Sequence, residues 1–154
     1  LRAMRRSWST SNCGGVVPTP GQFLPADEQI LAAASELLEL NRDAYLRQDF
    51  SRALEAVWHV LGDTNAYFAD HAPWKLKKTD PARMETVLYV TIEIVRKVAL
   101  LLQPVLPQTM TSMLDLLAVG QGTARNFEHF GTALVPGTEL PTPAPVFPRY
   151  EEDK

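Results

Sequence analysis

A tryptophan beside a cluster of lysines is the feature of this sequence that could bind a nucleic acid. Trp74 directly follows Pro73, and three of the next four residues, 75–78, are lysines. Because proline lacks an amide hydrogen and disfavours helix in the residue before it, a helix arriving here should end near Ala72. The ring then lies at a corner beside local positive charge, where an unpaired base can stack and its phosphates can meet the lysines.

Each residue of this stretch also has a structural interpretation. The ring of Trp74 could instead be buried, as an anchor for the loop between two helices. Lys75, Lys77 and Lys78 could form a solvated turn rather than contact phosphates. Asn65 precedes the corner by nine positions, and its amide could bond either the turn or the edge of a base; we favour the structural role.

No catalytic constellation is recognisable in the sequence. His59, His71 and His129 lie far apart and not at metal-ligand spacing, so we expect structural or surface roles for them. Cys13 is the single cysteine, which excludes an internal disulfide and a zinc cluster of cysteines, and no neighbouring base supports it as a nucleophile. The H-E-x-x-H, G-x-S-x-G and P-loop motifs do not occur. We therefore expect no catalytic residue and no metal site.

The composition is that of a folded domain. The 154 residues are 45% hydrophobic and 21% charged, which fits one compact soluble unit. A net charge of −3 argues against broad binding of duplex DNA but allows a small basic patch. No apolar run approaches the roughly 20 residues of a membrane span. We expect a cytoplasmic protein, with the mitochondrial matrix as the alternative because the first residues are basic and contain serine.

Four helices must position the corner. Asp49 is the expected N-cap of the second helix (50–72) and Asp80 that of the third helix (80–102), which Pro81 should open. The third is apolar on most sides, which is typical of a central helix. The fold class is therefore all-α, an antiparallel helix bundle. Apolar residues at spacings of three and four predict the helices over 26–47, 50–72, 80–102 and 108–118.

The same spacing makes predictions for single positions. Trp58 lies on the apolar stripe of the second helix and should be core. Glu55 and Glu93 have polar neighbours and should lie on solvated faces. Gly62 in a helix interior suggests close packing or a bend, since glycine otherwise costs helix stability.

The chain divides into three parts. Residues 1–25 are interpreted as a truncated helix end and a loop rich in glycine and proline, and residues 26–120 as the bundle. Because the first ten residues have no N-cap and no initial Met, we expect a piece of a longer protein. Residues 121–154 should form an extended, proline-rich tail that packs back on the bundle. Its expected anchors are apolar: Phe127, Phe130, Leu134, Val146 and Phe147.

Several motifs spread along the chain carry a family resemblance. They are Asn65-x-Tyr67, Ala72-Pro73-Trp74 with Leu76 and a lysine, Val87-Leu88-Tyr89, Glu93, Arg96, Leu101-Leu102-Gln103-Pro104-x-x-Pro107 and Phe147-Pro148-Arg149. Together they resemble the anticodon-binding, C-terminal domain of methionyl-tRNA synthetases, closest to alphaproteobacterial or related organellar members. The similarity covers the chain from about Asn12 onward.

This resemblance implies a helical bundle beside a nucleotide-binding catalytic domain. In that family the tryptophan at the position of Trp74 stacks on the first anticodon base, a cytosine of the CAU triplet. The family also reads the anticodon with an Asn and an Arg of the domain's first helix. Here only Arg2-Ala3-Met4-Arg5-Arg6 remains of it, and no Asn stands at the corresponding place. The expected RNA-binding residues are Trp74, Asn65, Lys75, Lys78, Arg2 and Arg6.

The family's catalytic motifs, His-Ile-Gly-His and Lys-Met-Ser-Lys-Ser, are absent, as is its zinc-binding knuckle. ATP and methionine would bind the catalytic domain, so we expect no cofactor in this chain and no activity from it alone. The expected partners are the anticodon loop of a methionine tRNA and the catalytic domain of the same enzyme, without DNA or membrane. The alternative is a non-catalytic, helical protein-interaction module, whose apolar docking would depend far less on salt than RNA binding does.

Overall fold

Helices form nearly all of the regular structure. The computed structural model describes residues 14–144 and 146. Within this range the only β-type pairing is an isolated bridge between Val16 and Glu139, so the all-α prediction is confirmed. The elements, in chain order, are α2 (Pro25–Leu46), α3 (Phe50–His71), α4 (Pro73–Thr79), α5 (Pro81–Leu102), α6 (Pro107–Leu116) and the 3₁₀-helices η2 (Gly122–Arg125) and η3 (Phe127–His129).

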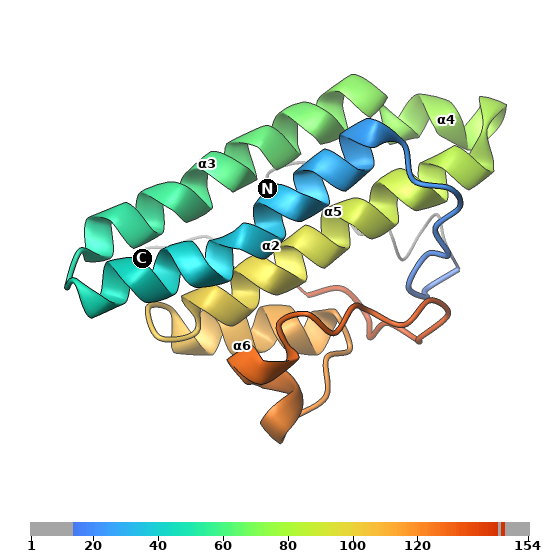
Figure 1. Cartoon of the computed structure of the whole chain (residues 1–154). Coiled ribbons are helices and arrows are strands. Elements are labelled where there is room, and N and C mark those ends of the chain that lie inside the picture. Colours follow the sequence, from blue (N-terminus) through green and yellow to red (C-terminus); the bar gives the residue numbers. More distant parts are fainter. Residues whose placement is uncertain (1–13, 145, 147–154) are drawn as a thin grey trace, which may run out of the picture.

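The long helices make an antiparallel bundle. Helices α2, α3 and α5 lie side by side, and α3 runs opposite to the other two (Figure 1). Helix α6 lies along α5, while α4 lies at the end of the bundle where α3 finishes and α5 begins (Figure 1). The four long elements of the sequence prediction agree with α2, α3, α5 and α6 to within two residues at each end.

Side-chain caps fix where the helices begin. The Asp49 carboxylate accepts a hydrogen bond from the Arg52 amide at 3.1 Å, at the start of α3. The Asp80 carboxylate accepts one from the Arg83 amide at 3.0 Å, and Pro81 follows as the first residue of α5. Both predicted N-caps are therefore confirmed, and they satisfy amides that a helix leaves without an internal partner.

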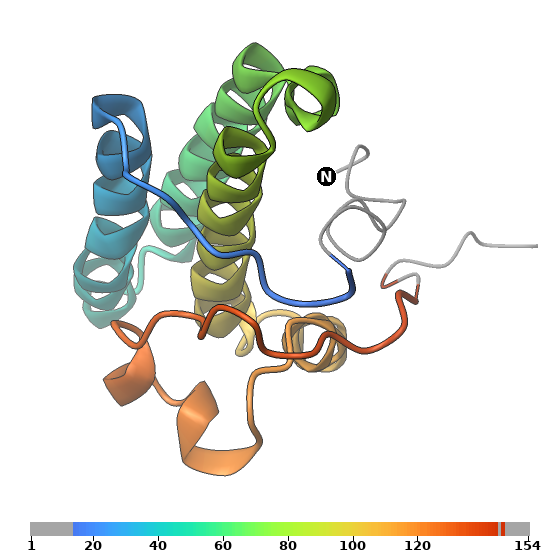
Figure 2. The ribbon, with the colours of Figure 1, turned by 90° about the vertical axis from the view of Figure 1, so that its right-hand side faces the viewer.

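Helix α5 is the centre of the core. It packs against each of the other four α-helices, and Figure 2, which looks along the bundle, shows it between them. Every residue from Thr86 to Leu102 is buried. The predicted central position of this helix is confirmed, and burial of its apolar surface on most sides stabilises the fold through the hydrophobic effect.

One prediction for α3 is wrong. The apolar spacing predicts Trp58 in the core, but 55% of its surface is exposed. The buried face of α3 is centred on residues 53, 57, 60, 64 and 67, and the side chain of Trp58 points about 100° away from that of Val57. For Gly62 the sequence predicts close packing or a bend, and close packing is not found, because a Cβ atom there would meet nothing within 4 Å.

The segment after α6 lies against the bundle and against the loop that precedes α2 (Figure 1). The Val17 amide donates to the Thr138 carbonyl at 2.8 Å. Phe130 and Leu134 are buried as predicted, whereas Phe127 is 41% exposed. Of the other expected anchors, Val146 is half-buried and Phe147 lies outside the described residues.

Glu93 is buried rather than solvated, which corrects the prediction from its neighbours. It accepts two hydrogen bonds from the Arg96 guanidinium, at 2.9 and 2.6 Å, and one from the Leu134 amide at 3.1 Å. Arg96 also donates to the Phe130 carbonyl at 2.9 Å. The ion pair therefore fastens the tail to α5, and long-range partners of this kind leave no sign in local sequence.

Candidate nucleic-acid interface at the α3–α4 corner

The corner between α3 and α4 is formed by one residue in the left-handed backbone region. Ala72 has φ 41°, and its amide donates to the Phe68 carbonyl at 3.2 Å, which closes the last turn of α3. Its own carbonyl accepts from the Lys75 amide at 2.8 Å, within the first turn of α4. Pro73 follows as the first residue of α4, a position that needs no amide hydrogen. The predicted end of the helix near Ala72 is confirmed, but a second helix starts at once instead of a turn.

Trp74 is the second residue of α4, and its ring is only partly covered. Its exposed fraction is 43%, while the preceding Pro73 is buried. The ring packs at an angle of 55° against Phe68 of α3, with the centroids 6.0 Å apart. This contact orients the indole, and the ring is not sealed inside the bundle.

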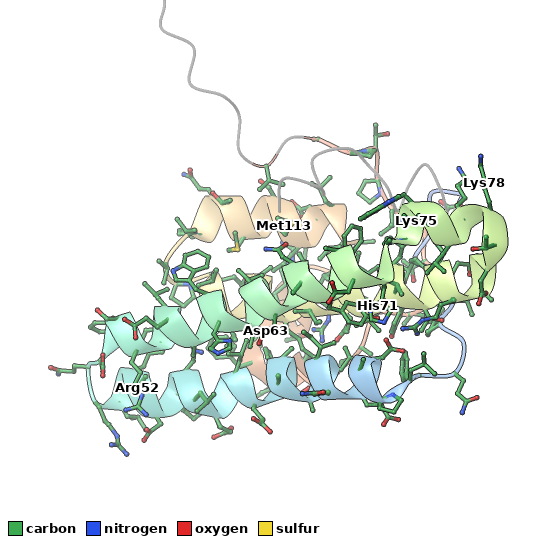
Figure 3. All side chains as sticks on the ribbon, turned by 90° about the horizontal axis from the view of Figure 1, so that it is seen from above. Arg52, Asp63, His71, Lys75, Lys78 and Met113 are labelled. Carbon is green, nitrogen blue, oxygen red and sulfur yellow. The ribbon has the colours of Figure 1, made fainter. Side chains whose placement is uncertain are left out.

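Three lysines share this short helix. Lys75, Lys77 and Lys78 are exposed, and Figure 3 shows Lys75 and Lys78 at the same end of the molecule as His71 of α3. Lys77 and Lys78 also lie in the last turn of α4, where their positive charge interacts favourably with the negative end of the helix dipole. The structure therefore gathers an aromatic ring and three cations on seven residues.

The remaining predicted site residues lie elsewhere. Asn65 is exposed on α3, on the helix that leads to the corner. Arg2 and Arg6 lie outside the described residues.

A buried ionic cluster next to the corner has no counterpart in the sequence predictions. Asp27, in the first turn of α2, has an exposed fraction of 0%. Its carboxylate accepts from the Tyr67 hydroxyl at 2.5 Å and from the Arg83 guanidinium at 2.5 and 2.8 Å. It also accepts from the Leu24 amide at 2.8 Å, which caps α2. The cluster thus joins the start of α2, the end of α3 and the start of α5.

The cluster stays charged at neutral pH. Burial alone would raise the pKa of Asp27, but hydrogen bonds from Arg83, Tyr67 and the Leu24 amide outweigh it and lower this pKa to about 2. Burial and the hydrogen bond to Asp27 raise the pKa of the Tyr67 hydroxyl well above its usual range, so it remains a donor. The sequence signal for Asp27 is only that of an acidic residue near a helix start, which predicts neither partner.

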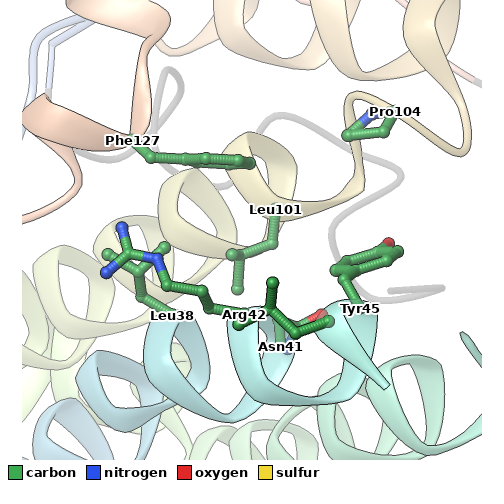
Figure 4. Close-up of a pocket in the computed structure, with 8 residues that line it drawn as sticks. Leu38, Asn41, Arg42, Tyr45, Leu101, Pro104 and Phe127 are labelled. Carbon is green, nitrogen blue, oxygen red and sulfur yellow. The ribbon is translucent and has the colours of Figure 1, made fainter. Parts of the chain in front are cut away.

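A cavity lies at the opposite end of the bundle. It has a volume of about 390 Å³ and lies between the C-terminal halves of α2 and α5 and helix η3 (Figure 4). None of the predicted RNA-binding residues within the described part of the chain lines it. Its lining is mainly apolar: Leu38, Asn41, Arg42, Tyr45, Leu46, Leu101, Pro104 and Phe127.

Within residues 14–144 and 146, no three His, Cys, Asp or Glu side chains are grouped so that they could hold a metal ion. In the same part of the chain, no helix is both long and apolar enough to cross a membrane.

Comparison with known sequences identifies close relatives. The methionine–tRNA ligases of Brucella suis, Mesorhizobium japonicum and Mycobacterium bovis are 47%, 50% and 48% identical to this chain, over 95%, 95% and 94% of its length. The chain spans 28% of the length of each of these relatives.

Solved structures give the same result. The crystal structure of the apo form of Mycobacterium tuberculosis methionyl-tRNA synthetase matches with a TM-score of 0.90 and 46% identity, over 96% of this chain and 30% of that one. The same enzyme in complex with methionyl-adenylate matches with a TM-score of 0.90 and 47% identity, over 93% and 29%. The resemblance drawn from the motifs, including that to alphaproteobacterial members, is confirmed. Residues 17–154 match the family model described as the anticodon binding domain of methionyl tRNA ligase, and the chain belongs to this family.

Proposed function

We propose that this chain binds the anticodon loop of a methionine tRNA, as the anticodon-recognition part of a methionine–tRNA ligase. The observation that carries the proposal is the partly exposed ring of Trp74 on a helix with three exposed lysines. Membership of the anticodon-binding family supports it.

Trp74 is the proposed stacking platform for the first anticodon base, the cytosine of CAU. The bases of a hairpin loop are already unpaired, so placing one against the indole costs little unstacking energy. Such a contact is worth about 1–3 kcal/mol per base. The ring of Phe68 packs against the indole of Trp74 and so supports it from the protein side.

The charged residues are proposed to position the RNA. Lys75 and Lys78 would hold phosphates next to the stacked base, and such contacts fix orientation without reading sequence. Arg2 and Arg6 would add further positive charge. Asn65 is proposed to bond either the edge of a base or the corner between α3 and α4 that carries Trp74.

The chain spans 28% of the length of its curated relatives, and we propose that it serves aminoacylation of tRNA as part of a longer enzyme. The anticodon contact would hold the tRNA so that its acceptor end reaches the catalytic domain, which would bind ATP and methionine. We propose that the chain does not aminoacylate alone, and that it works in the cytoplasm or, alternatively, in the mitochondrial matrix.

The test is binding of a fluorescently labelled hairpin with a CAU loop, followed by anisotropy. Trp74→Ala should weaken binding by about 1–3 kcal/mol, because the stacking surface is lost while the bundle remains folded by circular dichroism. Trp58→Ala is the matched control, since it removes an exposed tryptophan of α3 that the proposal does not use.

Unchanged affinity of the folded Trp74→Ala protein would contradict the proposal, as would an equal loss with Trp58→Ala. A second titration at higher salt separates RNA binding from docking of a protein partner. Phosphate contacts release counterions, so affinity for the hairpin should fall steeply as salt rises, whereas apolar docking would change little.

A further inference from the structure

The buried cluster of Asp27, Tyr67 and Arg83 connects the helix that precedes α4 with the helix that follows it. On one side, Tyr67 belongs to the end of α3, and the next residue, Phe68, provides the ring that packs against Trp74. On the other side, Arg83 belongs to the first turn of α5, directly after α4. The seven residues of α4 are therefore held between two elements that share one carboxylate.

The connection on the α3 side runs through the last turn of that helix. The rings of Tyr67 and His71 lie 4.3 Å apart, and His71 Nδ1 donates to the Tyr67 carbonyl at 2.8 Å. Ala72 follows in the left-handed conformation and sets the direction in which α4 departs. A rotation of Tyr67 would thus carry Phe68 and the corner with it.

The connection on the α5 side runs through the cap of that helix. The Asp80 amide donates to the Leu76 carbonyl of α4 at 2.8 Å, and the Asp80 carboxylate accepts from the Arg83 amide at 3.0 Å. The Arg83 guanidinium then forks onto both oxygens of Asp27. A bidentate pair of this kind fixes angle as well as distance.

We propose that Asp27, Tyr67 and Arg83 are positioning residues for RNA binding, which hold the α3–α4–α5 corner so that Trp74 meets a base at the correct angle. This inference rests on the proposed anticodon binding. None of the three needs to touch the RNA, because the cluster acts through the backbone on either side of α4. The competing explanation is that the cluster only stabilises the fold.

The test is Tyr67→Phe in the full 154-residue chain, combined with Trp74→Ala in a double-mutant cycle. Tyr67→Phe removes one hydroxyl and leaves the ring, so the variant should still fold, and binding is measured at a temperature well below its melting transition. The expected result is a loss of affinity for the CAU hairpin of about threefold to tenfold, the range for one buried hydrogen bond. Tyr89→Phe is the matched control, because it removes a hydroxyl that bonds the Leu134 carbonyl of the tail at 3.0 Å.

The cycle separates positioning from stability. If Tyr67 acts through Trp74, Tyr67→Phe should weaken binding in the wild-type background and have no further effect once Trp74 is alanine. Equal losses in both backgrounds, or wild-type affinity in folded Tyr67→Phe, would overturn the positioning role. Loss of affinity with Trp74→Ala alone, and none with Tyr67→Phe, would leave the proposed function intact while refuting this inference. If Trp74→Ala itself binds normally, the proposed function fails, and this inference fails with it.

A second variant tests the α5 side. Arg83→Lys keeps the positive charge next to Asp27 but cannot make the two-pronged contact. We expect it to weaken hairpin binding in the same Trp74-dependent way as Tyr67→Phe. Affinity equal to wild type in folded Arg83→Lys would show that the fork does not position the corner.

Discussion

The carboxylate of Asp27 is a charged group with no exposed surface, held by four hydrogen bonds. Removing an ion from water costs several kcal/mol, and only well-placed partners offset that cost. Here the partners are complete, since the described residues contain no buried side-chain nitrogen or oxygen without a hydrogen bond. The fork of Arg83 onto both oxygens of Asp27 fixes the relative orientation of α2 and α5 as well as their distance.

The pKa of Asp27 leads to a pH prediction. This pKa is about 2 in the folded protein and about 3.9 in an unfolded chain, so the carboxylate contributes stability above about pH 4 and loses it as the pH falls toward 2. The difference corresponds to roughly 2–3 kcal/mol. Asp27→Asn should be less stable than wild type at pH 7, and the gap should shrink by about that amount between pH 5 and pH 2.

Urea unfolding of both proteins across this pH range measures the gap directly. Wild type should lose stability faster than Asp27→Asn as acid is added. A gap that stays constant down to pH 2 would show that Asp27 has the same pKa in both states, contrary to the account of the cluster.

At the scale of elements, the sequence predicts the long helices well because each has a sustained apolar period and a recognisable start. Helix α4 has only seven residues, which are too few to show an apolar period. Pro73 is correctly interpreted as the end of α3, but the same residue is also well suited to open a helix. The prediction that Trp58 is buried is wrong for a related reason. Spacing gives the angle of a side chain around its helix, but not the width of the helix face that neighbouring elements cover.

Glu93 belongs to the element scale because it joins α5 to the tail. Glu93→Gln removes the charge that pairs with buried Arg96, and it should destabilise the protein by about 3–5 kcal/mol. Since the Leu134 amide donates to Glu93, exchange of that amide hydrogen should be faster in the variant. Hydrogen exchange followed by NMR measures this.

Glu55→Gln is the control, because Glu55 is exposed on α3 and a surface substitution usually changes stability by less than about 0.5 kcal/mol. If Leu134 exchanged equally fast in wild type and Glu93→Gln, the tail would be held by other contacts and the proposed fastening role of Glu93 would be wrong.

For the molecule as a whole, the corner and the cavity occupy opposite ends of the bundle. Sequence reasoning finds the corner, because tryptophan, proline and lysines are neighbours in the chain. It misses the cluster behind the corner, because Tyr67 lies 40 residues from Asp27 and Arg83 lies 56 residues from it. Contacts across that separation depend on how three helices pack, which composition and local spacing do not determine.

The central claim is that a base stacks on Trp74, and fluorescence of that indole tests it most directly. The chain contains three tryptophans, so Trp8→Phe and Trp58→Phe together leave Trp74 as the single reporter. The account predicts that a CAU hairpin quenches this fluorescence in a saturable way, with the same midpoint as binding measured by anisotropy. Binding by anisotropy without any change in the Trp74 emission would contradict it.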